Sequence, residues 1–399
     1  MKRKSIRGKR SKKSKVLAPQ LPRPYHAARS TYTDHLGWSR GNELDPFSKR
    51  RLMRVGIIGF AGSGKTTIFN ALAGIGGDVA PGKAGRINLR EVQVPDARID
   101  KLSLMYQPKK TIYASIQLAD LPGQAPGSGG GFDANSIAKM REMDLLVIVA
   151  RAFDNPYINA PIDPASEIGG MLAELLLADY TVVEKKVMRL RKEAAKGTER
   201  DLFEQLFATL EAEQWLSTLE LSEQSLELLT GFRLLTLKPV LVVLNTPEDK
   251  ADHDSASELI EPLSSFEAPI FALSAKLEAE IAELDPEEQL AFLAEIGIQG
   301  TARDRFIRAA YKSLDLISFF TVGEDEVRAW TVQRGANAQT SAGKIHTDLS
   351  KRFIRAEHMT CADLIELGSE AKVKEAGKFS LKGKEYITQD GDILHIRAS

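Results

Sequence analysis

The most regular feature of the chain is a series of short apolar runs separated by longer segments of mixed polarity. Four of these runs contain almost no polar side chains, namely Val55–Ile58, Leu145–Ala150, Val240–Leu244 and Ile270–Leu273. Apolar runs of this length without alternation are typical of strands buried on both faces. Because amphipathic segments lie between them, the pattern predicts an α/β fold with a mostly parallel sheet covered by helices.

A different pattern interrupts the sheet between the second and third runs. Apolar residues recur there at spacings of three and four, and the pattern resumes beyond Gly197. The first part of the stripe consists of Leu172, Leu176, Tyr180, Val183, Val187 and Leu190. This periodicity predicts an antiparallel α-helical hairpin, inserted at residues 166–237, whose apolar stripe forms the seam between its own helices.

The pattern changes again from about Leu314. Ile317–Val322 and Val327–Val332 predict a β-hairpin, residues 341–352 a helix, and residues 353–357 a strand. Tyr386-Ile387 and Ile393–Ile396 are predicted to pair across an Asp390-Gly391 turn. We therefore expect a small mixed sheet with a packed helix at 314–399, beside a discontinuous nucleotide-binding domain at 54–165 and 238–305.

Composition and charge agree with a globular protein that has a cationic N-terminal tail. Of the 399 residues, 43% are hydrophobic and 27% charged, and no apolar run approaches membrane-spanning length. The single cysteine, Cys361, excludes a disulfide framework and a cysteine-based zinc site, which fits the cytoplasm. Residues 1–53 hold fifteen Lys and Arg against three acids, so this tail is predicted to be disordered.

The first apolar run leads directly into Gly59-x-x-x-x-Gly64-Lys65-Thr66, the phosphate-binding loop pattern. Glycines let the backbone N–H groups wrap an anion, Lys65 supplies a positive charge to the β and γ phosphates, and the Thr66 hydroxyl can bind Mg²⁺. The helix that follows directs its N-terminus at the same phosphates. The cofactor-binding residues predicted here are Gly59, Gly62, Ser63, Gly64, Lys65, Thr66 and Thr67. We therefore expect ATP or GTP, with Mg²⁺, as ligand.

A second nucleotide motif follows a strand predicted at Ile112–Ala119. Asp120-Leu121-Pro122-Gly123 places a carboxylate at the end of that strand, where it can hold Mg²⁺ together with Thr66. The N–H of Gly123 can turn toward a γ phosphate. We assign Lys65, Gly123 and the adjacent Gln124 as the catalytic residues.

Two further motifs directly follow the third and fourth apolar runs. Asn245-Thr246-Pro247-Glu248 and Ser274-Ala275-Lys276 stand at the carboxyl ends of strands, where parallel sheets bind ligands. We assign nucleotide binding to Asn245, Glu248, Ser274, Ala275 and Lys276. Guanine offers two N–H donors to an Asp in this position, but the chain has the longer Glu248, so guanine selectivity should be lost.

From about Arg54 to the C-terminus the chain resembles the Obg-like ATPase (YchF) family. The resemblance rests on Val94-Pro95-Asp96-Ala97-Arg98, Pro108–Thr111, Leu176-Leu177-Ala178-Asp179, the two base-site motifs, Phe319–Thr331, Gly343–Asp348 and Phe353–Glu357. It implies a P-loop nucleotide domain, an inserted helical hairpin and a C-terminal TGS domain with a β-grasp fold. It also implies hydrolysis of ATP and association with the ribosome or RNA.

The chain departs from the family pattern at positions that matter for catalysis. Family members carry a histidine a few residues beyond Asp-x-x-Gly, where this chain has Gly129. We hypothesise that Gln124 orients the attacking water instead, as a Gln does in Ras-type GTPases; the alternative is an ordinary solvated loop residue. No threonine lies between Thr67 and Thr111, and Gly62 replaces the usual Asn, so slow turnover is expected.

Several functions remain open from the sequence. The first is a slow ATPase that acts as a ribosome-associated switch; the second is a ribosome- or RNA-binding module that uses nucleotide only for stability; the third is a conventional ribosome-assembly GTPase. The basic tail fits either an arm that binds RNA phosphates or a solubilising or localisation segment. We expect a monomer without a membrane partner.

Overall fold

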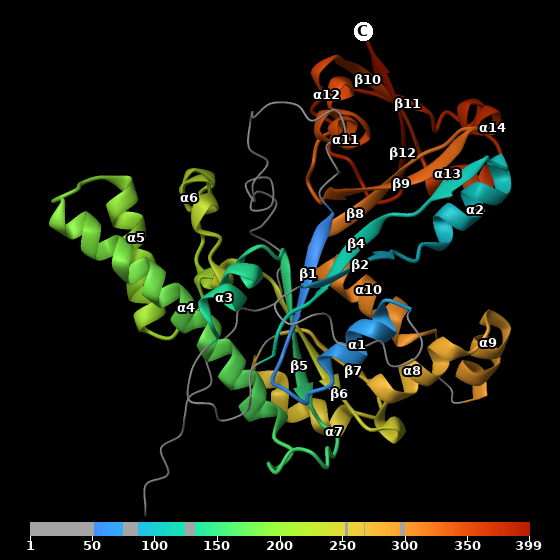
Figure 1. Ribbon diagram of the computed structural model, residues 1–399. Helices are drawn as coiled ribbons and strands as arrows, with labels where there is room; N and C mark the ends of the chain where they lie inside the picture. Colours follow the sequence, from blue (N-terminus) through green and yellow to red (C-terminus); the bar gives the residue numbers. More distant parts are fainter. Residues whose placement is uncertain (1–51, 75–86, 124–131, 252–253, 267, 296–299) are drawn as a thin grey trace, which may run out of the picture.

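The computed structural model describes residues 52–74, 87–123, 132–251, 254–266, 268–295 and 300–399. Residues 1–51 of the basic tail, Gln124 and Gly129 lie outside the described residues. Two six-stranded sheets form the body of the molecule, one in the nucleotide domain and one near the C-terminus (Figure 1). Within the described ranges, no helix has both the length and the apolar character required to cross a bilayer.

The first sheet has the strand order β2-β4-β1-β5-β6-β7. Its strands are β1 (Met53–Ile58), β2 (Asn88–Gln93), β4 (Ser115–Asp120), β5 (Leu145–Arg151), β6 (Val240–Asn245) and β7 (Ile270–Leu273). All neighbours pair in parallel except the edge strand β2, which runs antiparallel to β4. The prediction of a mostly parallel sheet is confirmed, and the carboxyl ends of its parallel strands share one edge.

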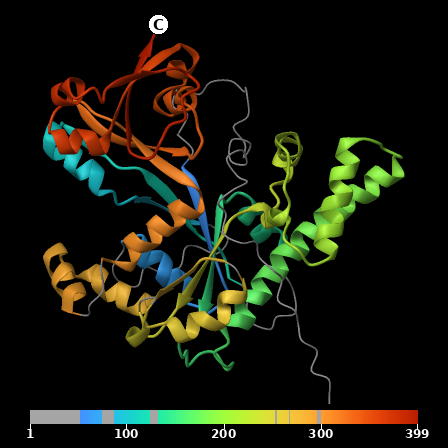
Figure 2. The same ribbon diagram turned by 180° about the vertical axis from the view of Figure 1, so that it is seen from behind.

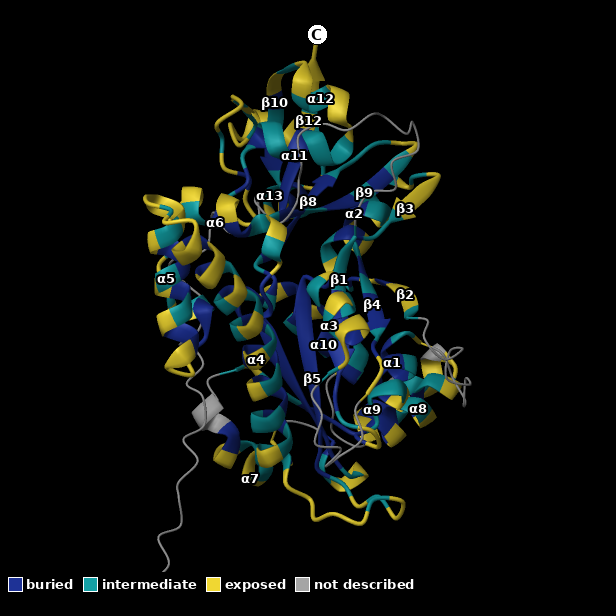
Figure 3. Cartoon of the chain, turned by 60° about the vertical axis from the view of Figure 1, so that its left-hand side comes forward, coloured by how far each residue is buried: buried dark blue, intermediate teal, exposed yellow. Residues whose placement is uncertain are grey.

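Successive side chains of the central strands enter two different hydrophobic cores. In β1, Ile57 packs in the core with α1, whereas Ile58 packs in the core with α4. The same division separates Val147 from Ile148 in β5. Figure 3 shows these strands as a buried centre between helical layers. Because both faces are covered, the strands read as continuous apolar runs instead of alternating ones.

The helices of the nucleotide domain lie on the two faces of this sheet. Helices on one face are α1 (Lys65–Leu72), α8 (Ala275–Glu283) and α10 (Ala302–Ser313), with α9 (Pro286–Glu295) beside α8. The opposite face carries α3 (Ala134–Arg141) and α4 (Pro164–Lys192), while α7 (Ser257–Ile260) follows β6. Figure 2 shows α8 and α9 on the side of the sheet away from the green helical hairpin.

The predicted helical insertion is an antiparallel pair formed by α4 and α5 (Thr198–Glu211), followed by α6 (Glu223–Leu229). Gly197, directly before the first residue of α5, has φ +101°, a conformation that glycine adopts without strain. The apolar stripe packs into one core with Phe203, Leu206 and Leu210. Short 3-10 helices occupy Leu216–Thr218, Thr230–Phe232, Leu235–Leu237, Glu248–Lys250 and Glu261–Phe266.

The second sheet is mixed and has the order β11-β10-β12-β8-β9-β3. Its strands are β8 (Leu316–Thr321), β9 (Glu326–Gln333), β10 (Phe353–Thr360), β11 (Ser380–Lys382), β12 (Asp392–Ala398) and β3 (Lys110–Ile112). Its helices are α11 (Ala338–Ile345), α12 (Thr347–Lys351), α13 (Cys361–Leu367) and α14 (Glu370–Glu375). The β8–β9 hairpin matches the predicted one, whereas the single helix predicted at 341–352 is divided into α11 and α12.

Two strand predictions differ from the structure. The predicted strand at 112–119 is confirmed from Ser115 onward as β4, whereas Ile112 belongs to β3, which pairs in parallel with β9 of the other sheet. The predicted hairpin at Asp390-Gly391 does not form, because Ile387 makes only an isolated bridge with Asn337. The Asp390 carboxylate instead accepts the Ser318 N–H at 3.0 Å, which closes the loop onto β8.

Helix α2 (Ala97–Tyr106) joins the two sheets. The Arg98 guanidinium binds both Asp96 at its own helix N-terminus and Asp390 of the C-terminal region, at 2.8 Å each. At the other end of α2, the Tyr106 hydroxyl donates to Glu370 at 2.7 Å. The segment that follows β2 is therefore fixed to the C-terminal sheet by charged contacts as well as by β3.

A buried polar cluster fixes the helical hairpin to the first sheet. Asp179 of α4 is fully buried, and its carboxylate accepts the backbone N–H and the hydroxyl of Thr236 at 2.7 and 2.8 Å. Arg141, the last residue of α3, forms an ion pair with the same carboxylate at 2.8 Å. The Lys238 ammonium lies in the same region and donates to the carbonyls of Arg141 and Met143.

The buried ammonium of Lys238 predicts a pH-dependent stability. Burial lowers its pKa from 10.5 to about 8, against the opposing attraction of Asp144 and Asp179. Between these pH values the unfolded chain binds more protons than the folded chain, so the free energy of unfolding should rise with pH, by at most about 1.4 kcal/mol per unit. Urea denaturation from about pH 7 to about pH 10 measures this slope.

The Lys238→Met variant should lose most of that rise, because no ammonium remains to be neutralised. Lys185→Met, a change at an exposed position of α4, serves as the control and should keep it. An identical slope in the wild type and in Lys238→Met would contradict the assignment.

Candidate functional site

The loop between β1 and α1 has a shape that only glycine permits at three positions. Gly62 and Gly64 have φ values of +81° and +86°, in the left-handed region. A Cβ atom at Gly64 would collide with the Asn245 amide, and one at Gly59 would lie 2.7 Å from the Val149 carbonyl. The backbone can therefore follow the tight path that phosphate binding requires, as the motif predicted.

Lys65, the first residue of α1, projects toward the end of β4. Its ammonium lies so close to Gly123 that a side chain there would overlap it. Burial lowers the pKa of Lys65, while the Asp120 carboxylate opposes that shift. The fold thus brings together Lys65 of the first motif and Gly123 of the second. The Asp120 carboxylate offsets only part of the effect of burial on the Lys65 ammonium.

Thr66 and Asp120 form the second half of this arrangement. The Thr66 hydroxyl donates to Asp120 Oδ2 at 3.0 Å, while Asp120 Oδ1 and Ser63 Oγ are buried without a hydrogen-bond partner among the described residues. Burial raises the pKa of Asp120, and Thr66 and Lys65 lower it. A hydroxyl beside a carboxylate with an unused oxygen is the donor set that P-loop proteins use for Mg²⁺, so these residues fit that ion.

Asn245 connects three of the predicted motifs. Its amide nitrogen donates to the Ser63 carbonyl at 2.9 Å, and its carbonyl oxygen accepts the Ala275 N–H at 3.0 Å. Ser274 caps α8 through its hydroxyl, which accepts from Leu277 N–H at 3.4 Å. Asn245 thus joins the phosphate loop to the ends of β6 and β7, and these three segments form one unit.

Glu248 and Lys276 meet at the edge of this unit. The Lys276 ammonium forms an ion pair with Glu248, and both side chains are solvent-accessible. The Thr246 hydroxyl donates to the Lys250 carbonyl at 2.6 Å and is turned into its own loop. The carboxylate that occupies the guanine-reading position therefore has a cationic partner within the protein.

The remaining predicted residues have simpler placements. Thr67 is exposed on the outer side of α1, and Gly123 is the last described residue before the loop that contains Gln124. The assignment of Gln124 lies outside the described residues and stays a prediction.

Arg151, the last residue of β5, and Asn155, which follows it, belong to none of the sequence motifs. Asn155 donates to the Gly62 carbonyl of the phosphate loop at 3.1 Å, and Arg151 is buried. Neither residue belongs to a known spacing pattern. The available signal was positional, since polar residues directly after a fully buried parallel strand lie at the ligand-binding edge.

Comparison with known proteins places this geometry in a family. Residues 54–186 match a family model described as a 50S ribosome-binding GTPase, and residues 316–399 match YchF-GTPase_C, described as a protein of unknown function. The chain is 37% identical over 361 residues to the ribosome-binding ATPase YchF of Bacillus subtilis, covering 86% of this chain and 99% of that protein.

Two further relatives extend the match. The ribosome-binding ATPase YchF of Escherichia coli O157:H7 is 35% identical over 357 residues, with 86% of this chain and 98% of that protein covered. The solved structure of the Schizosaccharomyces pombe YchF GTPase superposes with a TM-score of 0.75 at 29% identity, covering 90% of this chain and all of that one. The sequence identity, the coverage and the shared fold agree, and the chain belongs to the YchF family.

Proposed function

We propose that this protein is an ATPase that binds nucleotide at residues 59–66 and associates with the ribosome. The observation that carries the proposal is the convergence of unused polar groups at the phosphate loop. Ser63 Oγ and Asp120 Oδ1 are buried beside the glycine loop without a hydrogen-bond partner among the described residues, and burial lowers the pKa of the neighbouring Lys65 ammonium. Such a cluster costs folding free energy unless a charged ligand completes it.

The proposed roles follow from the positions of these groups. Lys65 and the N–H groups at the start of α1 hold the β and γ phosphates, and the N–H of Gly123 faces the γ phosphate. Thr66 and Asp120 hold Mg²⁺, which when bound neutralises charge on the phosphate oxygens. Gln124 orients the attacking water. The close arrangement of the other four residues, Lys65, Thr66, Asp120 and Gly123, supports their assigned roles. The role of Gln124 rests on the sequence alone.

We propose ATP as the preferred nucleotide, with GTP as the weaker ligand. Guanine recognition needs a carboxylate free to accept from two base N–H groups. Glu248 is longer than the Asp used for that purpose, and its charge is paired with Lys276. Adenine does not present that pair of donors, so its binding loses nothing from this arrangement.

The proposed partner is the ribosome or its RNA, as the names of the relatives suggest. Residues 314–399 are proposed to be the TGS domain, residues 54–165 and 238–305 the nucleotide domain and residues 166–237 the inserted hairpin. We propose that the C-terminal domain and the basic tail make the ribosomal contacts, and that the protein acts as a cytoplasmic monomer.

One experiment tests the proposal against its alternatives. Phosphate release by the purified protein is measured from ATP and from GTP, with and without ribosomes, beside equilibrium titration of both nucleotides. We expect multiple turnover of ATP and binding of ATP at least as tight as that of GTP. Binding without turnover in either condition favours the nucleotide-stabilised binding module, and a strong GTP preference favours the conventional GTPase.

A further inference from the structure

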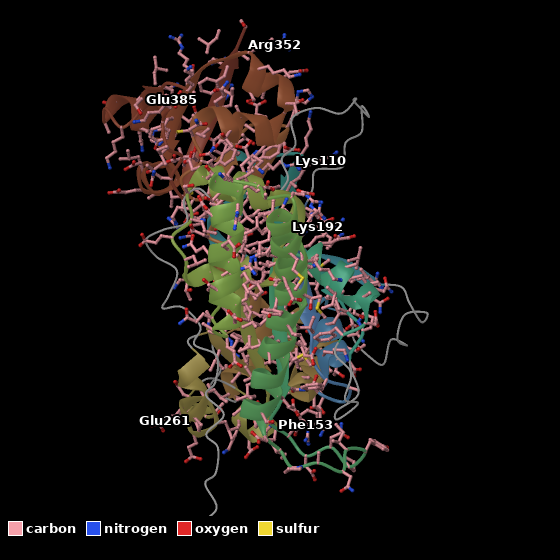
Figure 4. The ribbon with its side chains drawn as sticks, turned by 90° about the vertical axis from the view of Figure 1, so that its left-hand side faces the viewer. Lys110, Phe153, Lys192, Glu261, Arg352 and Glu385 are labelled. Carbon is pink, nitrogen blue, oxygen red and sulfur yellow. The ribbon has the colours of Figure 1, made fainter. Side chains whose placement is uncertain are left out.

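The segment that follows β5 is folded into a compact loop by one buried arginine. Arg151 is only 2% exposed, and its guanidinium donates to the Phe153 carbonyl at 3.4 Å near the start of the segment. It also donates to the carbonyls of Ala160 and Pro161, at 3.2 and 2.9 Å, near the end. Figure 4 places Phe153 close to the beginning of α4. Both ends of residues 153–161 are therefore held by the same side chain.

Arg151 is itself fixed from α4. Its backbone N–H donates to Glu167 Oε2 at 2.9 Å, and its Nε lies 3.5 Å from Glu167 Oε1. A buried guanidinium with a carboxylate partner and three carbonyl acceptors has little freedom to move. The loop is thus anchored to the end of β5 and to the first turns of α4.

Asn155 is the residue of this loop that reaches the phosphate loop. Its Oδ1 accepts the Tyr157 N–H at 3.1 Å, and its own carbonyl accepts the Ile158 N–H at 3.0 Å, so the side chain is fixed within a local Asx turn. The amide nitrogen points outward from this turn and donates to the Gly62 carbonyl at 3.1 Å.

The phosphate loop and this turn fit closely at Gly62. A Cβ atom at Gly62 would collide with the Ile158 side chain and lie 3.3 Å from the Asn155 amide nitrogen. The peptide unit between Gly62 and Ser63 is held on both sides, since the Ser63 N–H donates to the Phe60 carbonyl at 3.3 Å while Asn155 holds the Gly62 carbonyl.

We infer that Asn155 is a positioning residue for nucleotide binding, acting through the phosphate loop, and that Arg151 fixes the loop that carries it. A glycine-rich peptide rotates easily, and rotation here would turn the Gly62 carbonyl toward a bound phosphate. When the Gly62 carbonyl is held away from the phosphate site, the backbone N–H groups that follow it stay available to bind phosphate. The phosphate loop is then already ordered in the folded protein, so nucleotide binding does not have to pay the entropy of ordering it. The inference rests on the proposed nucleotide-binding function.

Asn155→Asp separates this role from an ordinary structural one. Aspartate keeps the oxygen that accepts from Tyr157 and so preserves the turn, but it loses the donor to Gly62. In the presence of Mg²⁺, we expect Asn155→Asp to release a fluorescent ATP analogue roughly three to ten times faster than the wild type does, as for one lost hydrogen bond. The kcat should change little, because the contact between Asn155 and Gly62 contributes equally to binding in the ground state and in the transition state.

The matched control is Asn159→Asp, which places the same charge at an exposed position of the same loop. Stopped-flow release of the analogue and thermal unfolding are measured for both variants and for the wild type. We expect Asn159→Asp to release nucleotide and to unfold as the wild type does, and Asn155→Asp to unfold only slightly below the wild-type temperature, as for one lost hydrogen bond.

The outcomes distinguish this inference from the function on which it rests. If the wild type binds the analogue and Asn155→Asp releases it no faster than Asn159→Asp does, the positioning role is refuted while nucleotide binding stands. A wild type that binds neither the analogue nor ATP would overturn the proposed function and this inference together.

Discussion

The Lys65→Ala variant is expected to lose ATP turnover by roughly a hundredfold or more, the loss typical of removing one preorganised electrostatic group from a phosphate or oxyanion site. The ammonium is placed by the first turn of α1 next to Gly123, and burial already lowers its pKa. Phosphate release from ATP under multiple-turnover conditions measures the effect.

The same substitution should leave the ligand-free fold intact. A desolvated ammonium costs folding free energy, so its removal should not lower the unfolding temperature. The wild type should unfold at a higher temperature when ATP and Mg²⁺ are added, and Lys65→Ala should lose this increase. Both measurements together separate a loss of ligand binding from a loss of structure.

Lys312→Ala is the matched control, since Lys312 is exposed near the end of α10. It should keep both turnover and the nucleotide-induced increase in unfolding temperature. Turnover in Lys65→Ala at the level of this control would mean that the phosphates bind elsewhere, and the assignment of residues 59–66 would fail.

The phosphate loop could be predicted from sequence because its determinants are local. A buried strand, four intervening residues and Gly64-Lys65-Thr66 specify a loop whose φ values only glycine tolerates, and the structure has that loop. Asp120 was likewise predictable, because the carboxyl ends of neighbouring parallel strands must meet at one edge. Its hydrogen bond to Thr66 follows from the pairing of β1 with β4.

The connection between the two sheets could not be predicted in the same way. A strand as short as β3 carries no periodicity, and its partner β9 lies more than 200 residues away in sequence. The dipeptide Asp390-Gly391 was predicted to be a hairpin turn, because Asp-Gly is common in such turns. The carboxylate was instead used for long-range contacts with Ser318 and Arg98, which no local pattern encodes.

The role of Asp179 could not be predicted from a local pattern either, because in the sequence it was only one residue of a stretch shared with the YchF family. Its importance is visible only from the contacts, since two segments outside α4 supply its partners: α3 ends at Arg141, and Thr236 precedes β6. Helix α3 also follows the segment that contains Gln124. Asp179 thus connects the hairpin to α3.

Asp179→Ala is expected to lower the free energy of unfolding by about 3–5 kcal/mol, the usual cost of removing one partner from a buried ion pair. The Arg141 guanidinium would keep only carbonyl acceptors, and the Thr236 N–H and hydroxyl would lose their acceptor. Urea denaturation gives the size of the loss. Hydrogen exchange should show the largest loss of protection in α4 and in residues 234–238, because the cluster joins these segments.

Two further variants test whether the loss comes from this cluster. Asp201→Ala removes an exposed carboxylate from α5 of the same hairpin and should change the free energy of unfolding by less than about 1 kcal/mol. Adding Arg141→Ala to Asp179→Ala should cost less than the sum of the two single changes, because the second substitution removes a charge that the first left unpaired. Strictly additive losses would show that the pair does not join α3 to the hairpin.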